Sequence, residues 1–350
     1  MDADLDLLLT AVYVTADDLL PERPGNARRS LTDAEVVTLC VAQAIMGIPS
    51  DRRFLAVASK HLRHLFPSIP AQPGYFKRRR RLADTLEWLM SVFASQSPGF
   101  YDDMLLVDST PVECARSRET VKRSQLGDAA DYGYCASHSR FFWGFRLHAI
   151  FAPDGTPRAV TVASPKRDER EVALELLGRT RRQGAVTLIG DKGYAGKGFA
   201  QAVSDMNATI LRPHRKDEPG RGPHLAPIRQ RVESIFWSCK GTLTLEHHGA
   251  RTLPGLRERI LQRLYIAAIP SRASVEPPTT AQRANLKGFL KSGPQCANEH
   301  PAAAPPGSTM PLPGAASLRG ALSREGPGRT SRFKSAHRLA DMVARVAYVG

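Results

Sequence analysis

The hydrophobic positions along the chain change their spacing near residue 100. Before that point, apolar residues recur every three or four positions, as in "SLTDAEVVTLCVAQAIMG" (residues 30–47), where Thr32 and Glu35 match a capping box. The stretch "GYFKRRRRLADTLEWLMSVFA" (residues 74–94) keeps the same helical spacing and predicts one long helix. Residues 1–98 are therefore expected to form a helical region.

From about residue 102 the pattern becomes one of short apolar runs separated by turn residues. Strands are predicted at residues 104–108, 141–151, 157–163, 185–191 and 208–213, and helices at residues 168–183, 196–206 and 228–241. An antiparallel meander of three strands followed by alternating helices and strands is typical of a ribonuclease-H-like mixed sheet. The expected fold is α/β, with a five-stranded sheet in residues 102–269 behind the helical region.

Two of these strands run directly into an aspartate. "MLLVDSTP" (residues 104–111) contains Asp108, and "VTLIGDKGY" (residues 186–194) contains Asp191. A carboxylate at the end of an apolar strand costs free energy unless a cation meets it. The first and fourth strands are neighbours in the expected sheet, so the two aspartates should lie side by side. The last helix should bring Glu233 over them.

Three converging carboxylates repel one another, but they suit hard divalent cations, which prefer oxygen ligands. We therefore expect Asp108, Asp191 and Glu233 to be both the catalytic residues and the metal ligands. Two Mg²⁺ ions roughly 4 Å apart, replaceable by Mn²⁺, would support an in-line displacement at phosphorus. The alternative is that each aspartate merely caps a turn or the following helix.

The charge of the chain points to nucleic acid. Lys and Arg number 49 against 34 Asp and Glu, which gives a net charge of +15, and such an excess attracts polyanions. The candidate DNA contacts are Lys77, Arg78, Arg79, Arg80, Arg81, Arg146, Arg229 and Lys240. Arg229 and Lys240 share a helical face with Glu233. The alternative is that they pair with Glu233 within the helix, and that Arg146 belongs to a partly buried structural pair.

Other features bound the class of protein. A hydrophobic content of 42% allows a real core. Five scattered cysteines form no C-x-x-C pair, so neither disulfides nor zinc are expected. A signal peptide and a membrane span are not apparent, which predicts a cytoplasmic, nucleoid-associated protein without a membrane partner. Residues 271–350 hold 9 of the 26 prolines and 11 basic against 4 acidic residues, so residues 270–350 are predicted to be a largely disordered basic tail.

Several motifs together resemble one known family. They are "VDSTPV", "GYCASHSRFFWGFRLH", "DERE", "IGDKGY" and "RQRVESIFWSCKG". Between Asp108 and about residue 263 the chain resembles DDE transposases of bacterial insertion sequences, most closely the IS982 family within the IS4-like group. The last motif matches their R-x3-E-x6-K signature through Arg229, Glu233 and Lys240, although Ala226 stands where the signature begins with tyrosine.

The resemblance implies a reaction and its partners. The enzyme would bind the terminal inverted repeats of its own element in double-stranded DNA, expose a 3′-OH by Mg²⁺-dependent hydrolysis, and join it to target DNA. A homodimer on DNA is implied as well. Asp168 matches a family position near the site, where it either helps to bind metal or only caps a helix.

One departure from the family lies after residue 269. Family members continue with a hydrophobic segment that packs on the core, whereas here Pro270 interrupts the helix and basic low-complexity sequence follows. A frameshifted or fused end would explain this, and would leave Leu264 and Ile266 less well covered. Two alternatives follow: an inactive, DNA-binding transposase relic, and a ribonuclease-H-like nuclease without strand transfer.

Overall fold

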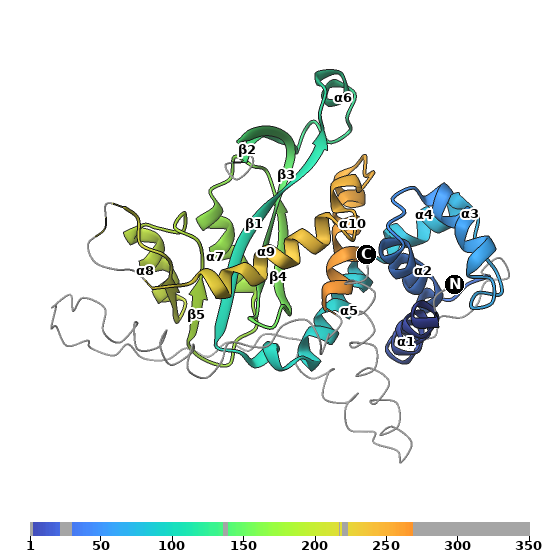
Figure 1. Cartoon of the computed structure of the whole chain (residues 1–350), viewed down its shortest axis with the longest axis horizontal. Coiled ribbons are helices and arrows are strands. Elements are labelled where there is room, and N and C mark those ends of the chain that lie inside the picture. Colours follow the sequence, from blue (N-terminus) through green and yellow to red (C-terminus); the bar gives the residue numbers. More distant parts are fainter. Residues whose placement is uncertain (1–2, 22–29, 136–138, 217, 219–222, 269–350) are drawn as a thin grey trace, which may run out of the picture.

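The computed structural model describes residues 3–21, 30–135, 139–216, 218 and 223–268 (Figure 1). The predicted tail, residues 270–350, lies outside the described residues. No helix in the described part of the chain is both long and apolar enough to cross a membrane.

Residues before the sheet are helical, as predicted. The helices are α1 (Ala3–Leu19), α2 (Asp33–Ile45), α3 (Asp51–His61), α4 (Gln72–Arg81), α5 (Ala83–Gln96) and the short 3₁₀ helix η1 (Pro98–Tyr101). The predicted capping box begins α2: the Thr32 hydroxyl accepts from the Glu35 amide at 3.1 Å, and the Glu35 carboxylate accepts from the Thr32 amide at 2.5 Å.

The prediction of one helix over residues 74–94 was wrong. Leu82, with φ −91° and ψ 7°, ends α4, and α5 starts at the next residue. Both helices bury apolar residues, but in different surroundings. Tyr75 of α4 packs against Phe54 of α3 at a ring-centroid distance of 6.0 Å, whereas Phe93 of α5 packs edge-on against Tyr265 at 5.4 Å. The break lets each helix face its own partner.

The sheet contains six described strands rather than the five predicted. They are β1 (Met104–Ala115), β2 (Asp131–Cys135), β3 (Arg140–Phe151), β4 (Pro157–Ala163), β5 (Val186–Ile189) and β6 (Ala208–Leu211). The order is β2-β3-β1-β5-β6, and β4 pairs with the second half of β3. β1, β3 and β4 are antiparallel neighbours, while β5 and β6 run parallel to β1. The additional strand is β2. It was not predicted because its sequence, "DYGYC", contains no apolar run and its side chains are alternately exposed.

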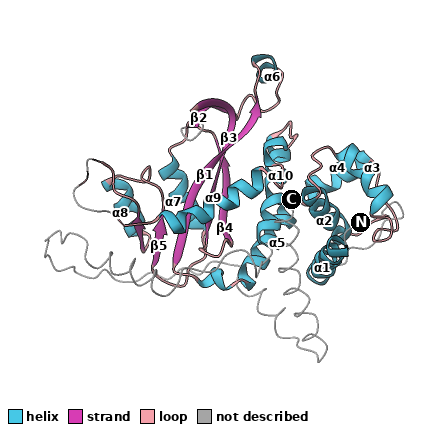
Figure 2. Ribbon diagram, in the orientation of Figure 1, coloured by secondary structure: helices cyan, strands magenta, loops and turns pink. Residues whose placement is uncertain are grey.

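Helices cover both faces of the sheet (Figures 1 and 2). The remaining ones are α6 (Arg118–Lys122), α7 (Glu169–Arg179), α8 (Lys197–Asp205), α9 (Ala226–Lys240), η3 (Leu245–His247) and α10 (Leu253–Ala268). One core, under α7 and α8, includes Leu105, Val107 and Leu188. The other includes Leu106, Ile189 and residues of α9 and α10, and it continues into α1–α5.

The helix α10 lies between the sheet and the N-terminal helices. Leu264 and Ile266 are buried, at 1% and 3% exposed. The expectation that these side chains would be poorly covered was therefore wrong. Both belong to the core that α10 shares with α2, α5 and β4, so the N-terminal helices supply apolar cover for this helix.

Candidate active site

Asp108 and Asp191 lie at matching positions on two neighbouring strands. β1 and β5 pair in parallel, with Leu106 opposite Ile189, and each aspartate follows two residues later. Leu106 and Ile189 both face the core under α9, and side chains two apart on a strand share a face. Figure 1 shows α9 crossing that face of the sheet. Asp191 therefore lies just after the carboxyl end of β5, but β1 continues past Asp108 to Ala115 because it goes on pairing with β3. The prediction that the first strand ends at Asp108 was wrong, although the charge of Asp191 does act on Asp108.

Local backbone contacts hold both carboxylates. The amide of Ser109 donates to Asp108 Oδ1 at 2.8 Å, and the amide of Gly193 donates to Asp191 Oδ1 at 2.7 Å. A Cβ at Gly190 would come within 2.7 Å of the Tyr194 ring. The "GDKGY" turn therefore needs glycine at that position to pack Tyr194 beneath the aspartate.

The Asp108 carboxyl group is tuned by its surroundings. Its pKa is raised to about 7, mainly by burial; the charges of Asp191 and Glu169 also raise it, while the Ser109 amide and the Arg229 guanidinium lower it. A second like charge beside a half-buried carboxylate is unfavourable without a cation. The pair is thus poised to accept one.

Glu233 does not join the two aspartates. It lies on α9 with a side chain 60% exposed, and its carboxylate is 3.7 Å from the Arg229 guanidinium four residues earlier. Among the described residues, no three His, Cys, Asp or Glu side chains converge on one metal position. The structure brings together Asp108, Asp191 and Arg229, and it shows for Glu233 the pairing within the helix that was the alternative interpretation.

Glu169, at the start of α7, is a nearby carboxylate that sequence reasoning missed. Its Oε1 lies 2.6 Å from the Arg146 guanidinium, and its Oε2 accepts from the Ser109 hydroxyl at 3.1 Å. Its charge also reaches Asp108. The acidic residues that begin the "DERE" helix indicated this position, but the prediction considered only the residue before it, Asp168.

That preceding residue, Asp168, caps α7. Its carboxylate accepts from the Arg170 amide at 2.8 Å and pairs with the Arg170 side chain at 2.5 Å. This hydrogen bonding lowers its pKa to about 2. The capping alternative describes its place in the structure.

Tyr194 lies close enough to the acidic residues for their charges to act on it. It is buried, and its hydroxyl has no hydrogen-bond partner among the described residues. Burial raises its pKa well above the usual range, and the charges of Glu169, Asp108 and Asp191 add to the effect. The hydroxyl therefore stays neutral and lies within electrostatic reach of all three carboxylates.

The basic candidates near the site are engaged within the protein. Arg146 donates to the Ser109 hydroxyl at 2.8 Å and to the Tyr134 carbonyl at 3.1 Å, in addition to its pair with Glu169. Lys240 ends α9 and is partly buried, which lowers its pKa. Arg229 keeps a side chain 28% exposed beside Glu233.

The five basic residues of α4 separate into two groups. Lys77, Arg80 and Arg81 are exposed. Arg78 pairs with Asp33 at 2.7 Å, and Arg79 is only 2% exposed. The expectation of five DNA-facing cations thus fails for Arg79, because Tyr75 and Arg79, one helical turn apart, face the core together.

No curated protein is significantly similar to the chain in sequence. Two solved structures are similar at low level. The piggyBac transposase synaptic complex with hairpin DNA has 10% identity and a TM-score of 0.37, covering 87% of this chain and 85% of that chain. The pre-cleavage Mos1 transpososome has 11% identity and a TM-score of 0.19, covering 72% and 83%. At these TM-scores neither likeness supports a functional assignment.

The family match is the informative comparison. Residues 101–269 match the family model described as transposase DDE domain. The matched segment begins just before β1, ends within a residue of α10, and contains Asp108, Asp191 and Glu233. Residues 101–269 of this chain are thus similar to a transposase DDE domain.

Proposed function

We propose that this chain is a transposase of the insertion-sequence type, IS982-like within the IS4-like group. It would cut one strand at the terminal inverted repeats of its element and join the freed 3′-OH to target DNA. Its ribonuclease-H-like core would carry the chemistry, and the helical region 1–98 would contribute to end recognition. The single observation that carries the proposal is that Asp108, on β1, and Asp191, just after β5, each lie two residues beyond the paired Leu106 and Ile189.

The residues present fit a divalent cation. Two carboxylates, one of them with a raised pKa, lie beside each other and offer the oxygen ligands that Mg²⁺ and Mn²⁺ prefer. Asp108 and Asp191 would hold the metal, and Glu233 would complete the set after leaving Arg229. Bound metal would supply Lewis-acid activation of water and charge neutralisation at the phosphorus.

The remaining residues have supporting roles in this proposal. Release of Glu233 would free Arg229 to bind a phosphate next to the reacting bond, with Lys240 at the end of the same helix as a second phosphate contact. Arg146 and Glu169 would hold Ser109, and with it the part of β1 next to Asp108, in place. These residues would position the strand end and the scissile phosphate.

DNA would bind through backbone contacts in the main. The net charge of +15 and the exposed Lys77, Arg80 and Arg81 on one helix favour attraction to phosphates. Two DNA ends would be paired by a homodimer, in the cytoplasm at the nucleoid.

A second candidate function is an inactive relic that binds element ends. One observation favours it: Glu233 is turned toward Arg229 and solvent rather than toward the aspartates. A ribonuclease-H-like nuclease without strand transfer is a third reading, which differs only in what happens after the first cut.

The test uses the full chain and a labelled duplex carrying the repeats that flank its own gene, with target plasmid, in Mg²⁺ or Mn²⁺. Nicking and joining that disappear in Asp191→Asn would support the transposase. Nicking without joining would indicate a nuclease. Repeat-specific binding without cleavage in either metal would indicate a relic, and equal cleavage by Asp191→Asn would refute the proposed site.

A further inference from the structure

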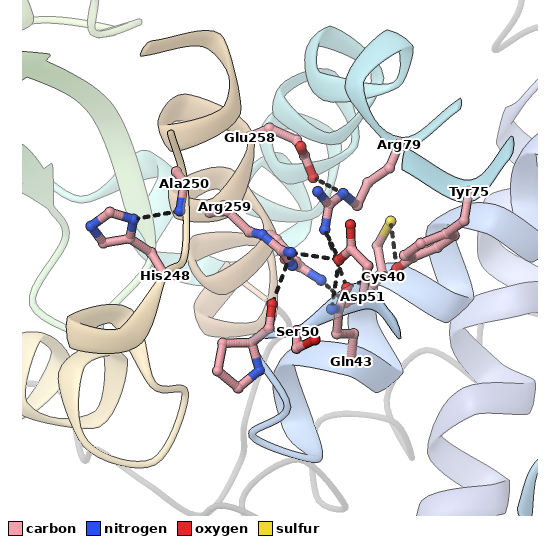
Figure 3. A network of polar contacts seen from close by, with 12 residues as sticks. Cys40, Gln43, Ser50, Asp51, Tyr75, Arg79, His248, Ala250, Glu258 and Arg259 are labelled. Atoms are coloured by element: carbon pink, nitrogen blue, oxygen red, sulfur yellow. Dashed lines mark hydrogen bonds and ion pairs between the residues drawn. The ribbon is translucent and has the colours of Figure 1, made fainter. Parts of the chain in front are cut away.

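A closed cluster of charged side chains joins α4 to α10 (Figure 3). Arg79 of α4 lies 2.6 Å from Glu258 of α10 and 2.7 Å from Asp51, the first residue of α3. Asp51 also pairs with Arg259 of α10 at 2.5 Å. Two cations and two anions from three helices thus alternate along one chain of contacts.

The cluster is closed off from solvent. Glu258 is 0% exposed, and Arg79 and Arg259 are 2% and 5% exposed. Gln43 of α2 bridges two members: its amide nitrogen donates to Asp51 at 3.0 Å, and its oxygen accepts from Arg79 at 3.3 Å. Arg79 and Arg259 each have an acidic partner on another helix. Their ion pairs therefore form only when those helices keep their relative positions.

Such a cluster is poorly suited to stabilisation alone. Removing charges from water costs about as much as their attraction returns, and apolar residues of similar volume often serve as well. What alternating buried charges do enforce is one geometry, because a shifted helix leaves a charge unpaired in an apolar surrounding. The cluster therefore selects one relative position of α4 and α10.

That position links the two sites of the proposed function. Arg79 points inward from α4, while Lys77, Arg80 and Arg81 of the same helix are exposed. On the other side, α10 follows α9 through η3 and packs against β4 and α5. The exposed basic face of α4 is thereby held at a set distance from Asp108 on β1 and Asp191 just after β5.

We propose that Arg79, Asp51, Glu258 and Arg259 are specificity-determining positioning residues, which set the phosphodiester that is cut. This inference rests on the proposed function. DNA held by the exposed face of α4 presents one phosphate to the aspartates only if the distance between the two sites is constant. Loosening the cluster would let neighbouring phosphates reach them.

The chain offers a matched control on the same helix. Arg257, next to Glu258, pairs with Asp84 at 2.8 Å and with Glu87, both on α5, but its side chain is 47% exposed. Exposed pairs contribute little and tolerate rearrangement. Arg257→Gln removes one ion-pairing residue from α10 without touching the cluster.

The experiment maps nick positions at single-nucleotide resolution on the duplex with the flanking repeats. The parent and Arg257→Gln should cut one dominant phosphate. Glu258→Gln should spread its nicks over adjacent phosphates, with the dominant share falling at least twofold while total nicking is largely kept. Arg79→Lys, which keeps the charge but loses the forked geometry, should spread them similarly and serves if Glu258→Gln does not fold.

A second readout needs no DNA cleavage. Orthogonal spin labels at Gln72 of α4 and Ser234 of α9 report the distance between the two sites. The distance distribution should broaden in Glu258→Gln and not in Arg257→Gln. Unchanged nick positions, or an unchanged distribution in folded Glu258→Gln, would overturn the inference and leave the cluster a purely structural element. A parent chain that never nicks would refute the proposed function, and the label distances then decide the positional claim by themselves.

Discussion

Charge is arranged in opposite ways in two regions of the molecule. On β1 and just after β5, Asp108 and Asp191 place like charges close enough to influence each other. Between α4 and α10, Arg79 and Glu258 belong to a buried group in which the signs alternate. The protein does not fully supply a counter-charge for the first arrangement. In the second, each charged side chain has an oppositely charged neighbour, although the Glu258 carboxylate accepts no hydrogen bond among the described residues. The first arrangement could therefore hold a cation, whereas the second connects helices.

The largest expected effect is on catalysis at Asp108 and Asp191. Asp191→Asn removes one carboxylate without changing the volume of the side chain, so nicking should fall by about 10³-fold or more. The melting temperature should not fall, because the like-charge repulsion with Asp108 is relieved. Gel-based nicking rates and thermal denaturation check both halves. A variant that nicks normally would show that the pair is only structural.

Substitutions in the buried cluster of Arg79, Asp51, Glu258 and Arg259 should instead change the free energy of unfolding. Arg79→Ala leaves Glu258 and Asp51 without their shared cation in a buried place, which should lower the free energy of unfolding by about 3–5 kcal/mol. Arg257→Ala, which breaks the exposed pairs to Asp84 and Glu87, should cost about 1 kcal/mol or less. Urea denaturation of both variants measures the contrast. Equal losses would remove the distinction between the two kinds of ion pair.

A buried neutral group adds a pH dependence to this comparison. His148 on β3 is 1% exposed, and burial lowers its pKa to about 4 from 6.5, helped by the charge of Arg146. As the pH falls below 6.5 the unfolded chain takes up a proton that the folded chain refuses, so stability falls between pH 6.5 and 4. The loss should reach about 3 kcal/mol for this residue.

His148→Leu should remove that contribution and flatten the curve of unfolding free energy against pH. Burial also lowers the pKa of His248 to about 4, so the variant should retain part of the acid sensitivity. A curve for His148→Leu that is parallel to that of the parent between pH 6.5 and 4 would contradict the assignment.

The smallest expected effect concerns the support of Asp108 and Asp191. Glu169→Gln weakens the contacts to Arg146 and Ser109 but leaves both aspartates in place, so nicking should fall by about 10–100-fold. Raising the Mn²⁺ concentration should recover part of the rate if the metal is held less tightly. Glu175→Gln, further along α7 and paired with the exposed Arg167, is the control and should leave nicking unchanged.

Local patterns in the sequence predicted the surroundings of Asp108 and Asp191 better than the buried cluster around Arg79 and Glu258. The strand at residues 157–163, the capping box before α2 and the position of Asp191 just after a strand were all predicted, because each depends on a short stretch of chain. Glu169 escaped notice because its partners, Arg146 and Ser109, come from other strands. Its acidic neighbour in the sequence, Asp168, was considered instead, as a helix cap or a metal ligand.

The buried cluster around Arg79 and Glu258 could not be predicted from local patterns. Five adjacent basic residues give no sign that the third one turns inward, since that depends on Glu258, 179 positions further along the chain. The break at Leu82 has the same origin: α4 and α5 each follow their own packing partners. β2 pairs with β3 through a short sequence whose side chains are half exposed, so its strand character depends on the neighbour.

The central claim is that Asp108 and Asp191 form one cation site. Calorimetric titration of the full chain with Mn²⁺ tests it most directly, beside Asp191→Asn, Asp108→Asn and, as a control on an exposed carboxylate of α8, Asp205→Asn. Saturable binding in the parent and the control, weakened about tenfold or more in each of the other two variants, is the predicted result. Equal Mn²⁺ binding by the parent and by Asp191→Asn would contradict it.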